Sequence, residues 1–569
     1  MKPTDQAPGE ELLPAHERRR ATTLRSVAAA AGTAVRSTAR RAVRALAPAL
    51  PTVLPASIVV LVGSWAMISF SVVQWRTMQV PSWDLAIFSE LAKAYSRLEA
   101  PIVPIKADGY NLLGDHFHPI LVLLGPVWRV FPSPLALLVV QDLLLAVSAW
   151  PLTRLAARLT NAWVGGVLGL VYVTSWGLQG AVAAQFHEVA LAVPMLAWAS
   201  AAFVERRWAA VAAWSVPLVL VKEDLGLTVL VIGLVTAWTG WREPSPVRLV
   251  GSLRVRVGSL GLGLALFGLL AFVVTTLVLL PMLNPEGTWA YGLGSPDGTD
   301  PTSQGSLLAR LVTPTVKLET LAVLVATGGV IALRSPWVLV AAPTLAWRFL
   351  GSVEFYWEWR SWHYNAVLIP IALGALLDVL ARLRTRRAEV PQPQVLTAPA
   401  SSQAPAPAGK PQRPASPDPV GTPRRPTGHG WRTAPRWVRA VAAVGLLVPV
   451  MTAALTAPHL PLWAMTQDGF AEPSERTRTA QQVINSVPEG ASVETDLSLL
   501  AYLVPKAEVS WVGTSESDKD YVVVDQWSSA WGGNPPADAA RWAEETSTEG
   551  SSYELVLDTN GFQVARRLP

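Results

Sequence analysis

The sequence contains no cysteine and little charge. None of its 569 residues is cysteine, and Asp, Glu, Lys and Arg together make up only 15% of them. A chain without cysteine forms neither disulfide bonds nor thiolate metal sites. The charged fraction is also well below the ~25% of average soluble proteins. This shortage argues against a soluble fold for most of the chain.

Hydrophobic residues supply 51% of the chain and gather in blocks long enough to cross a membrane. A hydrocarbon core of ~30 Å needs about 20 apolar residues per helix, and the first such block covers residues 54–73. Further spans are predicted at about 135–153, 162–178, 188–204, 208–221, 225–240, 257–281, 318–333, 336–351, 363–381 and 438–457. We therefore predict an all-α polytopic membrane protein with about eleven transmembrane helices.

The region between the first two spans, residues 74–134, is predicted to form a large first outer loop. An amphipathic surface helix is expected over residues 85–98. The apolar piece 120–131 is too short to cross the bilayer, so we expect it to lie at the interface or to re-enter the membrane.

The net charge of +5 is concentrated in two arginine-rich segments, residues 18–44 and 382–439, which flank apolar spans. Basic loops of this kind stay on the cytoplasmic side of a membrane. The distribution points to membrane lipid as the partner and away from nucleic acid. It predicts a plasma-membrane protein whose basic N-terminus, residues 1–53, is disordered and cytoplasmic, with a surface helix near residues 27–46.

The end of the chain changes character twice. Residues 382–437 are rich in Pro, Ala and Arg, which is typical of a cytoplasmic linker. Residues 458–569 have a soluble composition and are predicted to form a small extracytoplasmic α/β domain. A helix is expected over 475–487 with Ser474 as its N-cap. Strands are expected at 492–494, 509–512, 521–524 and 554–557.

Ionisable residues next to membrane spans are candidates for function, because charge near the bilayer is costly. Asp84 follows the first span and either caps the surface helix after it or acts as a general base at an outward cavity. Asp115, His116 and His118 are either polar turn residues or ligands of a divalent metal; alternatively, His116 and His118 form hydrogen bonds with a phosphate. No cofactor follows with certainty.

Further candidates lie where other outer turns meet helices. They are His187 and Glu188, the triplet Lys222, Glu223 and Asp224, and Glu358, Arg360 and His363 in an aromatic segment. The triplet either pairs internally or uses Lys222 to hold an anionic headgroup. The aromatic segment 355–365 resembles an interfacial belt, and its charged residues would also suit a sugar next to a phosphate.

Several short strings in the chain resemble those of a known family. They are Asp84-Leu-Ala-Ile-Phe, Gly114-Asp-His-Phe-x-Pro119, Gln185-Phe-His-Glu188, Lys222-Glu-Asp224 and His363-Tyr-Asn365. The chain is similar over about residues 55–380 to a bacterial family of predicted membrane proteins, domain of unknown function twenty seventy-nine. That family distantly resembles polytopic glycosyltransferases of the GT-C type, which use lipid-phosphate-linked sugars. The resemblance implies that Asp84 matches their first-loop acid, although their usual pair of adjacent acids is interrupted here by Leu85.

The leading hypothesis is therefore a membrane glycosyltransferase that uses a polyprenyl-phosphate-linked sugar donor and a cell-envelope acceptor. Asp84 would be its catalytic base, Lys222, Arg360 and His116 would hold the departing phosphate, and Glu358 would help to shape the sugar pocket. One alternative is a transporter or flippase of a lipid-linked envelope precursor, which would need ionisable residues deep within the spans. Another is a non-catalytic scaffold that would tolerate substitution at every one of these sites.

Overall fold

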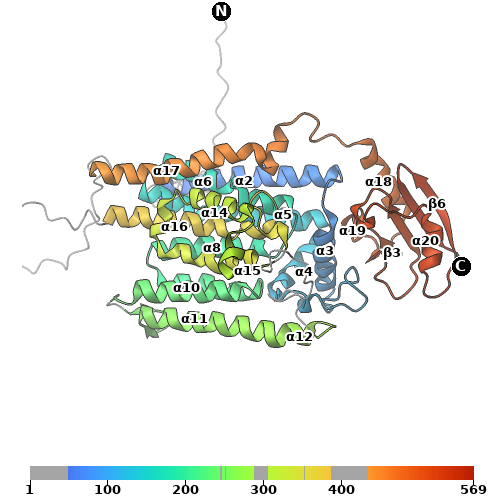
Figure 1. Ribbon diagram of the computed structural model, residues 1–569, viewed down its shortest axis with the longest axis horizontal. Coiled ribbons are helices and arrows are strands. Elements are labelled where there is room, and N and C mark those ends of the chain that lie inside the picture. The colour runs from blue at the N-terminus through green and yellow to red at the C-terminus, as the bar shows by residue number, and fades with distance from the viewer. Residues whose placement is uncertain (1–48, 244–245, 250, 288–305, 352, 386–433) are drawn as a thin grey trace, which may run out of the picture.

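The computed structural model describes residues 49–243, 246–249, 251–287, 306–351, 353–385 and 434–569. Most of it is a bundle of helices that lie alongside one another, with a small sheet domain at one end (Figure 1). The predicted surface helix at 27–46 and nearly all of the linker 382–437 fall outside the described residues.

Six described segments are long and apolar enough to cross a membrane. They are α2 (Leu50–Arg76), α5 (Pro134–Leu159), α6 (Ala162–Val173) with α7 (Trp176–Ala183), α11 (Val257–Val274) with α12 (Leu280–Leu283), α16 (Leu368–Thr385) and α17 (Arg436–Thr456). Several present large apolar side chains outward, including Leu61, Leu277 and Leu447 at 68%, 70% and 62% exposure. Such surfaces are unfavourable in water and suit lipid contact.

Four shorter apolar segments accompany them. They are η2 (Pro119–Leu123) with α4 (Leu124–Val130), α8 (Val189–Val204), α9 (Trp208–Ser215) with η3 (Val216–Leu220), and α10 (Leu225–Gly240). The first corresponds to the piece that was expected not to span. The other three coincide with predicted spans but are shorter than ~20 residues.

Two of the predicted spans, 318–333 and 336–351, do not form continuous helices. The first is α14 (Thr315–Thr327) followed by η6 (Ile331–Arg334), and the second is η7 (Pro336–Ala341) followed by α15 (Ala342–Leu350). Gly329 and Val330, with φ of 64° and 63°, end the first helix, because a left-handed backbone cannot continue it. The prediction of about eleven long transmembrane helices is therefore not confirmed, and six helices meet the criteria of length and composition.

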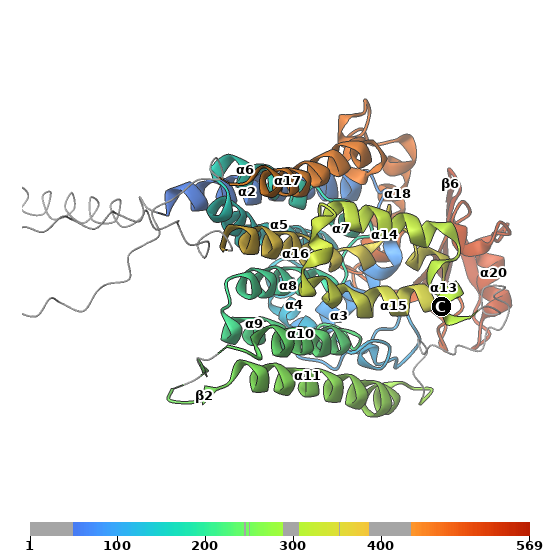
Figure 2. The same cartoon turned by 60° about the vertical axis from the view of Figure 1, so that its left-hand side comes forward.

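Helices α10 and α11 pack through a seam of glycines at seven-residue spacing. The seam contains Gly226, Gly233 and Gly240 of α10 and Gly261 and Gly268 of α11. A Cβ atom added to Gly233 would lie 2.3 Å from the backbone nitrogen of Ala265. Small residues allow two helix backbones to approach closely without an aqueous driving force. The pair forms the edge of the bundle opposite α2 and α17 (Figure 2).

The loop after α2 contains α3 (Ser82–Ser96) and η1 (Leu112–Gly114) in addition to η2 and α4. The surface helix starts three residues earlier than predicted, after the extended residue Pro81. Smaller elements complete the bundle: β1 (Val247–Arg248), β2 (Arg254–Val255), η4 (Thr275–Leu279), α13 (Leu307–Val312), η8 (Glu354–Tyr356), η9 (His363–Asn365), η11 (Ala457–His459) and η12 (Pro461–Thr466).

The sheet domain has five strands in the order β4-β3-β5-β7-β6. Strands β3 (Ser492–Thr495), β4 (Glu508–Trp511) and β5 (Tyr521–Asp525) run parallel, whereas β6 (Tyr553–Thr559) and β7 (Phe562–Arg567) are antiparallel. The predicted helix is α18 (Glu475–Ser486), and the Ser474 hydroxyl accepts a 3.0 Å hydrogen bond from the Thr477 amide, which confirms the N-cap. Strand β7 and helices α19 (Leu500–Leu503) and α20 (Ala539–Thr546) were not predicted. The two faces have separate apolar clusters, α18 and α19 covering one and α20 the other.

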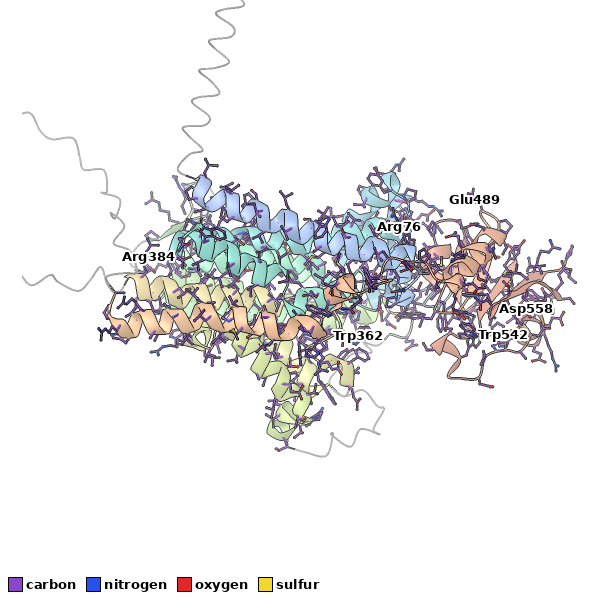
Figure 3. All side chains as sticks on the ribbon, turned by 90° about the horizontal axis from the view of Figure 1, so that it is seen from above. Arg76, Trp362, Arg384, Glu489, Trp542 and Asp558 are labelled. Atoms are coloured by element: carbon purple, nitrogen blue, oxygen red, sulfur yellow. The ribbon has the colours of Figure 1, made fainter. Side chains whose placement is uncertain are left out.

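The sheet domain is docked on α3. The Lys93 ammonium donates hydrogen bonds to the carbonyl oxygens of Val504 and Ala507 at 3.0 and 2.7 Å. The Ser82 hydroxyl accepts one from the Ala501 amide at 2.7 Å. One apolar cluster extends from α3 into α18, α19 and the sheet. We call this end of the bundle the domain end and the opposite one the far end; Figure 3 shows Arg76 toward the first and Arg384 at the second.

Candidate functional site

Asp84 and His187 form a pair at the domain end. Asp84 lies in the first turn of α3, and its Oδ2 is 3.4 Å from Nε2 of His187. The Asp84 side chain is 37% exposed, whereas that of His187 is only 5% exposed. Pro81 occupies the N-cap position of α3 and no side chain caps the helix. The interpretation of Asp84 as a helix cap is therefore wrong.

Hydrogen bonds to neighbouring residues fix the orientation of His187. Its Nδ1 lies 3.1 Å from the carbonyl oxygen of Gln185, and its amide donates to the Gln141 side chain at 3.0 Å. A ring nitrogen facing a carbonyl carries the hydrogen, so Nε2 is the atom available to Asp84. Burial disfavours the charged imidazolium, but the carboxylates of Asp84 and Glu188 outweigh it and raise the pKa of His187 above its usual 6.5.

His363 stacks on His187. Their ring centroids are 3.6 Å apart with an interplanar angle of 25°, and His363 is buried at the start of the span that contains α16. Phe88 of α3 approaches the His187 ring from the edge, with centroids 5.9 Å apart. Three predicted site residues from separate segments, Asp84, His187 and His363, are thus brought together.

Lys222 is bound to Glu188 in the interior. The ammonium donates a 2.7 Å hydrogen bond to Oε1 of Glu188, and the two side chains are 10% and 2% exposed. Burial by itself would raise the pKa of Glu188, but the Lys222 charge dominates and holds that pKa well below its usual range. Both side chains therefore stay ionised in a setting that excludes water.

Each member of the triplet 222–224 takes a partner from another segment. Glu223 accepts hydrogen bonds from His116 Nδ1 at 2.8 Å and from the Phe117 amide at 3.1 Å. Asp224 accepts one from the Trp347 indole at 2.9 Å, and burial raises the pKa of its carboxyl to about 6. The interpretation that the triplet pairs internally is wrong. Instead it joins three parts of the site.

Of the remaining candidates, His118 borders this cluster and interacts with the charges of Glu188 and Glu223, whereas Asp115, Glu358 and Arg360 have contacts of their own. Asp115 pairs with Lys106 at 3.3 Å and accepts from the Tyr110 hydroxyl at 3.3 Å. His118 is buried, and its edge faces Phe88 with ring centroids 5.9 Å apart. Glu358 and Arg360 are exposed. Within the ranges that the structure describes, His, Asp and Glu side chains form no group of three suited to a metal ion.

Arg348 was missed by the sequence reasoning, although it organises the aromatic segment. Its buried guanidinium donates to the carbonyl oxygens of Tyr356 at 2.7 Å and of Tyr364 and Glu358 at 3.4 Å each. These bonds fold residues 353–365 over α15 and place His363 against His187. An arginine inside an apolar stretch was the available signal, because such a residue needs a built partner set.

Asp142 was also missed. It lies within the span α5 and is fully buried; the Ser71 hydroxyl of α2 lies beside its carboxylate, whose oxygens make no well-formed hydrogen bond within the described residues. The adjacent Gln141 side chain holds the His187 amide and donates to the Ala181 carbonyl at 3.1 Å. The span α5 therefore contains an ionisable group one residue after the glutamine that holds His187, which is the kind of residue that the flippase alternative requires.

A comparison with known proteins assigns a family without assigning an activity. The model of the family DUF2079, described as a predicted membrane protein, matches residues 74–400, which is more than half of the chain. The match includes Asp84, His187, Lys222 and His363. A search of curated proteins found no match. The chain is a multi-pass membrane protein that belongs to the DUF2079 family of predicted membrane proteins.

Proposed function

We propose that the protein is a membrane glycosyltransferase that moves a sugar from a polyprenyl phosphate to an acceptor hydroxyl at the domain end. One observation carries the proposal, the pairing of a partly exposed carboxylate, Asp84, with a buried histidine, His187, at 3.4 Å. A general base needs access to its substrate and a group that fixes its orientation. Asp84 has both.

The reaction follows from this arrangement. Asp84 takes the proton of the acceptor hydroxyl while the hydroxyl oxygen attacks the anomeric carbon of the donor sugar. The bond from that carbon to the phosphate oxygen breaks, and the polyprenyl phosphate leaves with the electron pair. His187 is a positioning residue that fixes the orientation of the Asp84 carboxylate.

The departing phosphate gains negative charge and is stabilised by nearby cations. Lys222 is buried against Glu188 and Arg360 lies on the surface. His116 is 23% exposed at its side chain and is polarised by Glu223, which makes it the best placed of the three. We assign the first phosphate contact to His116, and the positive charge of the buried Lys222 adds electrostatic stabilisation without direct contact.

The proposal includes the orientation of the chain in the plasma membrane. Arginine side chains gather at the far end, where Arg158 contacts Glu205 and Arg206 and Arg382 contact Asp378. Basic residues are retained on the cytoplasmic side. The far end and the N-terminus are then cytoplasmic, and the site and the sheet domain face the cell envelope, where a lipid-linked sugar and its acceptor meet.

The decisive experiment is mass spectrometry of lipids that co-purify with the protein. We expect the wild type to retain a polyprenyl phosphate and the Asp84→Asn variant to retain the intact sugar-linked form, because the isosteric amide cannot accept the proton. Glu99→Gln is the matched control, since it neutralises an exposed acid just beyond α3. Bulk phospholipid alone in all three samples, or sugar transfer by Asp84→Asn at the wild-type rate, would overturn the proposal.

A second candidate, a flippase for a lipid-linked precursor, is favoured by Asp142. A carboxyl group buried inside a span is costly, and such groups mark ion or substrate pathways in transporters. The test is movement of a fluorescent short-chain polyprenyl phosphate across proteoliposomes that contain the purified protein. A flippase would lose this movement in Asp142→Asn and keep it in Asp84→Asn. The transferase predicts no protein-dependent movement.

A further inference from the structure

A cavity of about 240 Å³ lies between the sheet domain and the end of α2, separate from the Asp84 site. Its walls include Thr77 and Gln79 from the chain after α2 and Arg476, Ser498 and Asp525 from the sheet domain. The hydroxyl of Thr477 donates to the Thr77 carbonyl at 2.9 Å and fixes the two walls relative to each other.

The position of the cavity in the sheet is one where ligands bind in other open α/β folds. Parallel strands β3 and β5 are neighbours, yet the chain leaves them in opposite directions. After β3 it runs through α19 to β4, and after β5 it runs through α20 on the other face. Such a switch point opens a crevice at the carboxyl ends of the strands. Ser498 follows β3 and Asp525 ends β5, so both line the cavity at this edge.

The side chains in the cavity include both a hydrogen-bond acceptor and a hydrogen-bond donor. Asp525 is 4% exposed and pairs with the Arg476 guanidinium. Its Oδ1 also accepts from the Trp527 amide at 2.8 Å, and among the described residues no hydrogen bond reaches its Oδ2. Arg476 is held against the rings of Trp527 and Phe562, 3.9 and 4.1 Å from their centroids. A fixed carboxylate beside a fixed guanidinium matches a pair of neighbouring hydroxyl groups, each of which donates and accepts.

We propose that this cavity binds a saccharide, one neutral sugar ring with vicinal hydroxyl groups. Its volume lies below the ~300–1,000 Å³ of pockets for drug-sized ligands, which suits one ring. Asp525 and the buried Asp496 behind it disfavour a phosphate. Gln79 and the hydroxyls of Thr77 and Ser498 supply further polar contacts, and Phe562 supplies an apolar wall. The cavity adjoins the start of α3, which carries Asp84, so a glycan anchored here extends along the membrane surface.

The test is binding of free sugars to the purified full-length protein in detergent, measured by saturation-transfer NMR and isothermal titration calorimetry. The probes are glucose, galactose, mannose, arabinose, N-acetylglucosamine and their disaccharides, with inorganic phosphate as a separate probe. At least one sugar is expected to bind. Asp525→Asn is expected to weaken that binding about tenfold or more, which is the loss of one charge-assisted contact.

Two further variants locate the site. Ser498→Leu fills the cavity without removing a charged partner, and it is expected to abolish binding with thermal unfolding unchanged. Arg541→Gln, which alters an exposed arginine on α20, is the control and keeps full binding. Asp84→Asn also keeps it, which separates this proposal from the catalytic one. No bound sugar, equal affinity in the Ser498→Leu variant, or binding of phosphate alone would overturn the proposal.

Discussion

The buried pair of Lys222 and Glu188 allows a sharp test of how the site is held together. Nζ of Lys222 and Oε1 of Glu188 are 2.7 Å apart, and the two side chains are 10% and 2% exposed. Glu188→Gln leaves a buried ammonium without its nearest counterion, and Lys222→Met leaves a buried carboxylate in the same position. Breaking a buried pair from one side costs ~3–5 kcal/mol of unfolding free energy. We expect each single variant to lose about that much.

The double variant Glu188→Gln/Lys222→Met has no charge left to desolvate. Its loss should be smaller than the sum of the two single losses by roughly 2 kcal/mol or more. Unfolding can be followed by tryptophan fluorescence in mixed micelles at increasing SDS fraction. The control is Arg541→Gln, which breaks an ion pair of the same 2.7 Å length at an exposed site and should produce no measurable change. A coupling below about 0.5 kcal/mol between Lys222 and Glu188 would refute the reasoning.

Two further predictions concern the bundle and its docked domain. Gly233→Leu should abolish stable expression, because a Cβ atom at this position already lies 2.3 Å from the α11 backbone. Gly263→Leu is the control and should be tolerated, because no atom lies within 4 Å of its added Cβ. Comparable yields of the two variants in detergent size-exclusion chromatography would contradict this prediction. Burial raises the pKa of Glu90 to about 7 from 4.5, against the opposing Lys93 charge. Between pH 4.5 and about 7, Glu90 is protonated in the folded protein but ionised in the unfolded chain. The free energy of unfolding therefore falls by roughly 3 kcal/mol as the pH rises from about 4.5 to 7. Thermal melts in that range should show the decline, and Glu90→Gln should flatten it; an unchanged slope in the variant would contradict the assignment.

The sequence contained enough information to identify the protein as a membrane protein, because the length and composition of a helix that can cross lipid are local properties. The long apolar blocks correspond to α2, α5, α11, α16 and α17. The N-cap at Ser474 could also be predicted from the sequence, because capping involves residues only three positions apart. The two spans at 318–333 and 336–351 were overestimated because hydrophobicity was counted without weighing the glycine and proline residues that interrupt the helices.

The candidate residues were recognised as a set, but their partners were not. The sequence left open whether Asp84 caps a helix or acts as a base, and whether the triplet 222–224 pairs with itself. The structure pairs Asp84 with His187. It also pairs Glu223 with His116, and these two residues are 107 positions apart in the chain. It also leaves Arg360 at the surface and shows that Arg348 is a buried organiser of the aromatic segment.

The sequence by itself thus determined the class of protein, the positions of most apolar helices, the separate sheet domain and a group of ionisable residues worth explaining. Only the tertiary structure decided which carboxylate meets which cation, that the sheet domain docks on α3 through Lys93, and that a cavity opens between β3, β5 and the end of α2. The physical reason is that hydrophobic length and capping act within a few residues of chain. Ion pairs, stacked rings and cavities instead depend on helices brought together by packing, and no spacing along the chain specifies them.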